Sequence, residues 1–400
     1  MRISSNEQFQ QGIDSILDQQ ARLNRTQQQL ATGKNVLKPS DNPAVAAQLL
    51  NLSSLKAKNI QYDRNVTIAR SELGLQDNAL TSSSNVLQRV RELVIQANNA
   101  TQSDQSRAAI ADELNNLADE LLQLSNTKNA ASEYIFSGYD SRTPTYTKTG
   151  TGFSYQGDQG QRLIQVSEDA QLAVRDAGVD VFEGMKNGDG RFDLVTPATN
   201  TGSGLVLMTT KSDAVVDDYS ITFSQASELD PIIYSVTGVE SGAVATGAYS
   251  SGSTINFNGI SLSVEGTPAN GDSFQVNRSE RQSVFKTVQD IANSLNVELN
   301  NISKRVKLSN DLSHALYSMD QALEHIQARR TIVGNRLQTL DTRVNENADT
   351  KLRIEEQVSQ LQDLDFAEAV SRLNLQSVAL QAAQQSYIKI QGLSLFNYLR

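Results

Sequence analysis

The chain has 400 residues, of which 38% are hydrophobic and 6% aromatic, with no Trp. This length exceeds one small core, so roughly two or three domains are expected, and the low apolar content favours long, narrow helical layers over a thick globular core. The formal net charge of −10 argues against nucleic acid as a partner, because a phosphate-binding surface requires a positive field.

Cysteine is absent, which excludes disulfides, thiolate catalysis and cysteine metal sites. The absence also fits a protein that leaves the cell. Residues 1–8 contain no apolar segment of the kind found in a cleaved secretory signal. No run of about 18 apolar residues occurs, so no membrane insertion is expected. If the protein is exported, its route must recognise an uncleaved N-terminus.

Residues 9–30 form the first predicted helix. Its apolar side chains fall mostly on one helical stripe, and glutamines occupy much of the remaining surface. The stripe contains Phe9, Ile13, Ile16, Leu17, Leu23 and Leu30.

Residues 30–44 then interrupt the helical pattern. Gly33 can adopt the positive φ that ends a helix, and Pro39 and Pro43 prevent helix across the middle of the stretch. Asn42 is placed to cap a second helix, with Pro43 in its first position. On these residues alone, the stretch is either an ordinary helix–loop–helix connection or a functional loop.

Two more helices are predicted before residue 139. Residues 45–97 have helical periodicity with one interruption near Gly74. A third helix has a heptad seam, in which apolar residues alternate at spacings of four and three. This seam contains Ile110, Leu114, Leu117, Leu121 and Leu124. Periodicity and composition both change at residues 136–139.

Residues 140–280 have a different character, rich in Gly, Thr and Ser, with short alternating runs at 219–223, 232–236 and 254–257. The pair Asn258-Gly259 followed by the alternating run 260–264 predicts a β-hairpin over residues 253–264. A small β-rich domain inserted between helical halves is therefore expected.

Helical periodicity resumes near Ser283 and becomes a long four-three seam. The first part of the seam, broken only at Arg330, contains Leu312, Leu316, Met319, Leu323, Ile326, Val333, Leu337, Leu340 and Val344. The same spacing continues through Ile354, Val358 and Leu361, with Asn347 and Lys351 at the intervening seam positions. No proline interrupts it, so one very long helix is predicted. Asp365, followed by Glu368, resembles a capping box that begins a last helix.

The last predicted helix carries no charged residue from Leu373 to Ile388. A helix with one face in water would normally present Lys and Glu, whereas a neutral amide face suits packing on several sides. Alone, such a helix would be marginally stable in water. Either it is buried within one domain, or it completes its core only in an assembly.

The predicted fold is mainly α with an inserted β-rich domain, in which the two ends of the chain pair as a long antiparallel coiled-coil rod. The expected divisions are a terminal helix and loop over 1–44, the first half of the rod over 45–139, the insertion over 140–280, the second half over 281–364 and a last assembly helix over 365–400.

No catalytic, cofactor or metal site is expected. The only histidines, His314 and His325, lie on one predicted helix without a His-Glu-x-x-His motif and are interpreted as solvated or seam-edge residues. Residues 187–190 have the glycines of a calcium loop, but Met185 occupies the place of the first acidic ligand, so a polar turn is predicted. Gly33 and Lys34 lack the flanking residues of a phosphate-binding loop, and no Gly-x-Ser-x-Gly elbow occurs.

Residues 30–34 (LATGK) and 39–44 (PSDNPA) resemble the N-terminal signature of bacterial flagellins and flagellin-like hook-associated proteins. Within that family, residues 393–400 (LSLFNYLR), 153–158 (FSYQGD) and 179–182 (VDVF) are similar to the proteins of the hook–filament junction. The organisation of the chain, with helical ends around a β-rich insertion, resembles the same family.

This resemblance implies a structural role in a ring formed by self-association, with hook-associated protein 1 on the cell-proximal side and flagellin on the distal side. It also implies export unfolded through the flagellar type III channel, with a cytoplasmic export chaperone holding the C-terminal helix, and a final location in the flagellum. The expected interface is apolar. It comprises Ile13, Ile16, Leu23 and Leu30 at the front of the chain, and Leu373, Leu380, Leu393, Leu395 and Phe396 at the back.

Two other functions are also compatible with the sequence. The first is a flagellin filament subunit, which would be distinguished by its much greater abundance. The second is a helical rod that displays a surface-binding β module. Deletion of residues 140–280 would distinguish the two roles, because a pure scaffold keeps filament attachment whereas a binding module loses its ligand.

Overall fold

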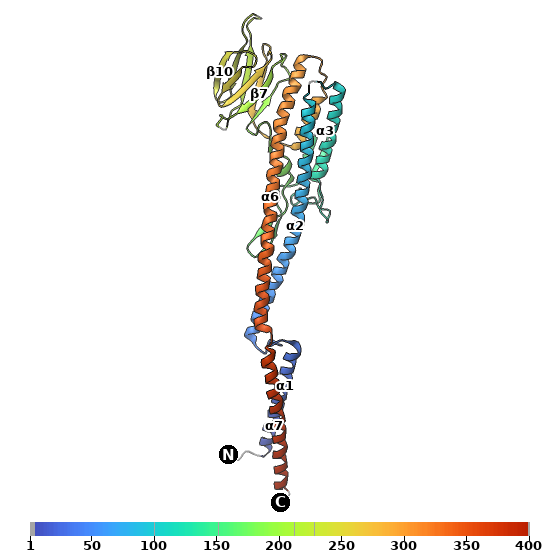
Figure 1. The fold of residues 1–400 in the computed structure, drawn as a ribbon, viewed down its shortest axis with the longest axis vertical. Coiled ribbons are helices and arrows are strands. Elements are labelled where there is room, and N and C mark those ends of the chain that lie inside the picture. The colour runs from blue at the N-terminus through green and yellow to red at the C-terminus, as the bar shows by residue number, and fades with distance from the viewer. Residues whose placement is uncertain (1–4, 100, 151, 212, 228, 399–400) are drawn as a thin grey trace. The chain divides into compact units, whose positions relative to one another are not determined.

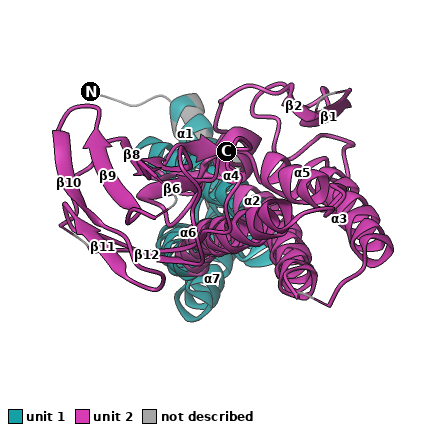
Figure 2. Ribbon diagram, turned by 90° about the horizontal axis from the view of Figure 1, so that it is seen from above, with its two compact units in different colours: residues 1–64, 342–400 teal, residues 65–341 magenta. Residues whose placement is uncertain are grey.

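The computed structural model describes residues 5–99, 101–150, 152–211, 213–227 and 229–398; the side chains of residues 5, 6, 8, 9 and 390–398 lie outside this description. The chain forms two compact units, one of residues 1–64 and 342–400 and one of residues 65–341 (Figure 2). Both ends are helical and the middle is rich in antiparallel strands, which confirms the predicted fold class. None of the described helices has a segment long and apolar enough to cross a membrane.

The first unit contains α1 (Ser5–Thr32), α7 (Phe366–Tyr398), and parts of α2 (Pro43–Ala97) and α6 (Ile302–Gln362). α1 and α7 lie side by side (Figure 1). They are antiparallel, because Thr26 hydrogen-bonds Gln376 while the earlier Gly12 lies against the later Tyr387. The Lys56–Glu355 ion pair (2.9 Å) joins α2 to α6 within this unit.

In the second unit, α2 and α6 also run antiparallel. Arg91 pairs with Asp320 (2.6 Å) and the earlier Asp77 pairs with the later Arg330 (3.3 Å). α6 is continuous over 61 residues, which confirms the single long helix. Its fully buried seam side chains recur every seventh residue, as the heptad pattern predicts; they are Leu312, Met319, Ile326, Val333 and Leu340.

α2 is continuous through Gly74, so the predicted interruption there is wrong. A Cβ on Gly74 would meet nothing within 4 Å, so no neighbouring atom requires a glycine at this position. One interior glycine weakens a helix by only about 1 kcal/mol. Burial of Leu73 and Leu80 on the same helix offsets that loss.

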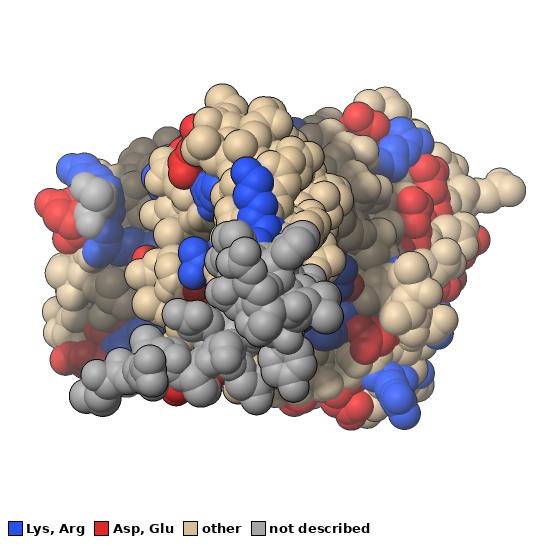
Figure 3. Space-filling model, turned by 90° about the horizontal axis from the view of Figure 1, so that it is seen from below, with Lys and Arg blue, Asp and Glu red and all other residues tan. Residues whose placement is uncertain are grey.

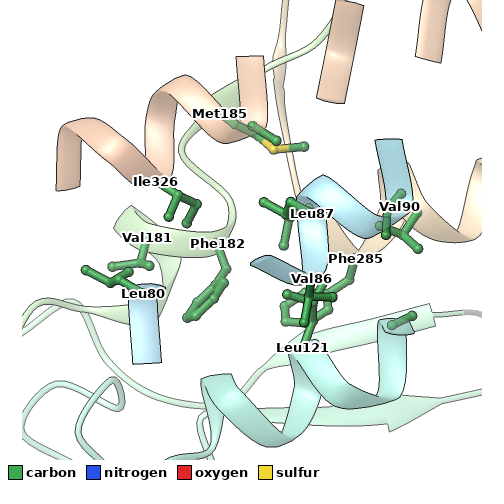
Figure 4. Packing of buried hydrophobic residues seen from close by; sticks show 14 of the residues in the cluster. Leu80, Val86, Leu87, Val90, Leu121, Val181, Phe182, Met185, Phe285 and Ile326 are labelled. Carbon is green, nitrogen blue, oxygen red and sulfur yellow. The ribbon is translucent and has the colours of Figure 1, made fainter. Parts of the chain in front are cut away.

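The helical core of the second unit is completed by α3 (Asp104–Ser125), α4 (Gly178–Phe182) and α5 (Val284–Leu295). Ser103 caps α3 by accepting a hydrogen bond from the Ser106 amide (3.1 Å), and the predicted seam of α3 faces inward. Figure 4 shows side chains of several of these helices meeting, including Phe182 and Phe285, whose ring centroids are 5.8 Å apart.

Short strands that follow α3 in the chain pack onto this helical core. They are β1 (Tyr146–Thr149), β2 (Gly152–Tyr155), β3 (Leu163–Gln165), β4 (Gln171–Ala173) and β5 (Met185–Lys186), with β14 (Arg281–Gln282) pairing with β5. Tyr146, Val166, Phe182 and Met185 are buried in the same cluster as the helices. The stretch predicted as one insertion thus contributes to two separate cores.

The second core belongs to strands within residues 192–278, which we call the β module. One sheet has the order β10 (Gly242–Ala248), β9 (Ile233–Gly238), β8 (Tyr219–Ser224), β13 (Ser273–Arg278), β6 (Phe192–Val195), and the other has the order β11 (Thr254–Phe257), β12 (Ile260–Glu265), β7 (Leu205–Thr210). β11 and β12 form the predicted hairpin, with positive φ at Asn258 (43°) and Gly259 (82°), as a two-residue turn of this kind requires.

A buried charge network, absent from the sequence predictions, ties the strands to the helices. The Arg175 guanidinium donates to Glu72 of α2 (2.9 Å) and to Glu133 (2.5 Å). The adjacent Asp176 accepts hydrogen bonds from Gln76 of α2 (2.8 Å) and Arg336 of α6 (2.9 Å). Two consecutive residues thereby bind both long helices.

Candidate assembly surface

The loop of residues 33–42 begins where the sequence predicts. α1 ends at Thr32, Gly33 has φ +68°, and the Gly33 amide donates to the Gln29 carbonyl (2.8 Å). This is the left-handed C-terminal residue that favours glycine. At the other end, the Asn42 side chain accepts a hydrogen bond from the Val45 amide (3.2 Å), and Pro43 is the first residue of α2. Both predicted helix signals are confirmed.

Asp41 organises the interior of the loop. Its carboxylate accepts hydrogen bonds from the amides of Leu37 (3.1 Å) and Lys38 (2.9 Å) and pairs with Arg25 of α1 (3.1 Å). The amide of Lys38 is the main cause that holds the pKa of Asp41 below its usual value, with further contributions from the Leu37 amide and Arg25. The loop therefore has one hydrogen-bonded conformation.

The break between α6 and α7 lies against this loop. The Asn35 amide donates to the Gln362 carbonyl (2.7 Å), and the Leu364 amide donates to the Gly33 carbonyl (3.0 Å). Asp365 caps α7 by accepting from the amides of Ala367 and Glu368, which confirms the predicted start. The reciprocal half of the capping box is absent, because the Glu368 carboxylate accepts instead from Arg372 (2.8 Å).

Two glycine substitutions test the conformational role of this corner. Gly33→Ala is expected to lower the free energy of unfolding by about 1 kcal/mol, because alanine at φ +68° is strained. The matched control, Gly74→Ala, is expected to raise it by roughly 0.5–1 kcal/mol, because this glycine lies inside a helix with open space around its Cα. Urea titration followed by circular dichroism measures both, and a change of the same sign in the two variants would contradict this account.

α1 and α7 meet along a narrow seam. Ile16, Leu23 and Leu30 of α1 and Leu373 and Leu380 of α7 are half-buried there. In the described part of the two helices, the fully buried side chains are Thr26, Gln29 and Ala369, and Thr26 donates to the Gln376 side chain (2.8 Å). This pair therefore has little apolar core of its own.

Apolar side chains away from the seam stay in contact with solvent. The exposed fractions are 43% for Ile13, 57% for Leu17, 70% for Leu375, 63% for Val378 and 65% for Ile388. Ile13 is thus the one predicted interface residue with a described side chain that is largely exposed. The side chains of Leu393, Leu395 and Phe396 lie outside the described residues.

The prediction did not select Leu17, Leu375, Val378 or Ile388. A heptad assignment would have found the α7 members, since the seam runs through Leu373, Gln376 and Leu380 and Leu375, Val378 and Ile388 lie off it, where they are exposed. Contiguous apolar side chains in water mark sites of protein association. The surface of α1 and α7 is therefore the strongest candidate functional site.

A small, mainly apolar notch lies between the loop and the start of α2. Its volume is about 270 Å³, and it is lined by Val36, Leu37, Lys38, Pro39, Ala46, Leu49 and Leu50.

No group of three His, Asp or Glu side chains that could hold a metal ion occurs among the described residues. Both histidines contact neighbours: His314 lies beside Asp193 and His325 bonds the Asp180 carbonyl (2.9 Å). The 187–190 stretch is a polar turn, in which Asp189 accepts from the Phe192 amide (2.7 Å). On the face that Figure 3 shows, Lys and Arg side chains are interspersed with Asp and Glu.

Comparison with known proteins agrees with these features. The N-terminal helical region of bacterial flagellin matches residues 3–141, and its C-terminal helical region matches residues 316–399. Flagellar hook-associated protein 3 of Salmonella typhimurium (strain LT2) is 25% identical over 400 residues, covering 100% of both chains.

Two solved structures from Legionella pneumophila are similar in fold. Flagellar hook-associated protein-3 is 31% identical, with a TM-score of 0.74 over 78% of this chain and 98% of that chain. The flagellar junction protein FlgL is 32% identical, with a TM-score of 0.67 over 73% of this chain and 99% of that chain. The chain therefore belongs to the flagellin family, as a homologue of flagellar hook-associated protein 3.

Proposed function

We propose that this chain is a structural component of the bacterial flagellum that joins the hook to the filament. The observation that carries the proposal is the α1–α7 pair, whose described side chains include several exposed apolar ones and a buried set of Thr26, Gln29 and Ala369. Such a pair gains its stability when neighbouring subunits cover it. The full-length similarity to flagellar hook-associated protein 3 favours the junction over a flagellin filament subunit.

The finer assignment follows from the place of such a protein between two assemblies. The chain self-associates into a ring, contacts hook-associated protein 1 on one side and flagellin on the other, and is carried to the flagellum by the type III route with a chaperone on its C-terminal helix. The absence of charged residues from 373–388 supports this assignment. The chaperone would cover the apolar side chains of this stretch before assembly, and neighbouring subunits would cover them afterwards. The role is structural rather than catalytic.

Loss of the protein tests the proposal directly. Cells without it are expected to build hooks and to release flagellin into the medium, because filament subunits are exported but have no junction to hold them. Electron microscopy of the cells and immunoblotting of the supernatant give the result. Filaments that remain attached to hooks would contradict the junction role.

Hydrogen exchange of the dilute monomer tests the need for partners. Amides of α1 and α7 are expected to exchange much faster than those of α3. α3 buries Ile110, Leu114 and Leu121, whereas the buried side chains in the described part of the terminal pair are polar or small. Slow exchange in both terminal helices, matching α3, would show that they are stable alone and would remove the physical basis for the assembly role.

A further inference from the structure

The face of α6 toward the β module is a polar stripe. Ser303, Lys307, Asn310, His314 and Ser318 recur at spacings of four and three residues, the same rhythm as the apolar seam of the helix. Among the described residues, α6 contributes none to the apolar core of the module. The helix and the module therefore share no apolar core, although Tyr317 of α6 borders a small enclosed pocket with Val206 and Met208. Most of the polar contacts between them are hydrogen bonds.

Four members of the stripe hydrogen-bond the module or its base, and His314 lies beside a carboxylate without a hydrogen bond. Ser303 donates to the Asn200 carbonyl (3.3 Å) and Lys307 to the Thr196 carbonyl (3.1 Å). His314 lies beside the carboxylate of Asp193 in β6. Ser318 accepts from the Gly188 amide (3.0 Å), in the turn through which the chain enters the module.

Asn310 makes the central contact. Its side-chain oxygen accepts from the Val206 amide (2.9 Å), and its amide nitrogen donates to the Gly204 carbonyl (3.0 Å). Val206 belongs to β7, an edge strand that pairs with β12 on its other side. Asn310 thus replaces a missing neighbouring strand, and α6 covers the open edge of the sheet.

Part of this joint borders a cleft, although the facing atoms Asp193 Oδ1 and His314 Nε2 are shielded from solvent. A cleft of about 320 Å³ lies between β6, α5 and α6, and its lining includes Asp193, Thr196, Lys307 and His314. Carbonyl, carboxylate and ammonium groups that separate there can bond water instead, so little is lost when the contacts open. Opening either apolar core has no such compensation.

We propose that the β module is a releasable unit, which undocks from α6 as one body while both apolar cores stay folded. Two chain segments, 187–191 and 279–280, remain as its tethers. Release exposes the edges of β6 and β7. In a junction between two assemblies, mechanical load would separate the β module from α6 before either apolar core unfolds. This mechanical role rests on the proposed function, whereas undocking itself can be tested without it.

Native-state hydrogen exchange of the full chain tests the proposal, with the Val206 amide as reporter because its partner is on α6. In the wild type it is expected to exchange through an opening that leaves the amides of β8 protected, since β8 pairs with strands on both sides. Lys307→Met, which alters a different contact, is expected to speed Val206 exchange about tenfold without affecting β8. Ser303→Ala is a second variant with the same expected direction.

Ser309→Ala is the matched control. Ser309 is also on α6 but donates to Asn98, the residue that follows α2 (3.0 Å), so its removal is expected to leave Val206 exchange unchanged. Three results would overturn the proposal: Val206 exchanging only together with β8 in the wild type, Val206 unaffected by both Lys307→Met and Ser303→Ala, or β8 exchange accelerated along with Val206 in those variants.

Discussion

Replacing Arg175 with Met is expected to lower the free energy of unfolding by about 3–5 kcal/mol, the loss found when one partner of a buried ion pair is removed. The Arg175 side chain is 2% exposed, and those of Glu72 and Glu133 are 12% and 30% exposed. Without the guanidinium, the Glu72 carboxylate loses its cation beside the helical core, and Glu133 keeps only Arg162 (3.3 Å), whose side chain is 48% exposed. Urea denaturation followed by circular dichroism measures the change.

Arg91→Met is the matched control for this substitution. Arg91 forms an ion pair with Asp320, but both side chains are well exposed, so the expected loss is below about 1 kcal/mol. Adding Glu72→Gln to the Arg175→Met variant should recover part of the stability, because it removes one uncompensated charge. Equal losses in the Arg175 and Arg91 variants would show that burial of the network does not determine its contribution.

Leu375→Asp is expected to abolish filament attachment while leaving the fold of the monomer unchanged. Leu375 is 70% exposed on α7, so a carboxylate there is harmless in the free chain but would be buried without a partner in an assembled ring. Leu380→Asp is also expected to abolish assembly, but it should in addition weaken the α1–α7 pair, because Leu380 is half-buried on that seam. Motility assays and electron microscopy report assembly, and thermal unfolding reports the monomer.

Asn374→Asp separates the effect of charge from the effect of losing an apolar contact. Asn374 is the exposed neighbour of Leu375, so it brings the same charge to the same part of the helix and should be tolerated better. Normal filaments on cells that carry Leu375→Asp would show that the exposed face of α7 is not an assembly surface.

Much of the terminal corner could be read from local residues. Gly33, Asn42 and Asp365 act through bonds to residues at most four positions away, so their roles follow from short-range stereochemistry. The meeting of the two helix breaks did not follow from the sequence, because the Asn35–Gln362 and Gly33–Leu364 bonds join residues more than 300 positions apart. The sequence distinguished exposed interface residues from seam residues only in part. Leu373 and Leu375 are both leucines of the last helix, and only the position of the α1–α7 seam shows which of them faces α1.

The sequence by itself determined the order of the helices, their heptad seams, the β-hairpin and the polar character of the 187–190 turn. These features could be predicted because periodicity and turn chemistry act within a few residues. Only the tertiary structure decided that Arg175 and Asp176 bind both long helices, that the strands divide between two cores, and that a polar stripe on α6 meets the β module. These arrangements depend on groups brought together from distant parts of the chain, and a buried arginine or a bridging asparagine carries no periodic signal of its own. The family signature consists of residues that are adjacent in the sequence, whereas these tertiary contacts join residues that are far apart in it.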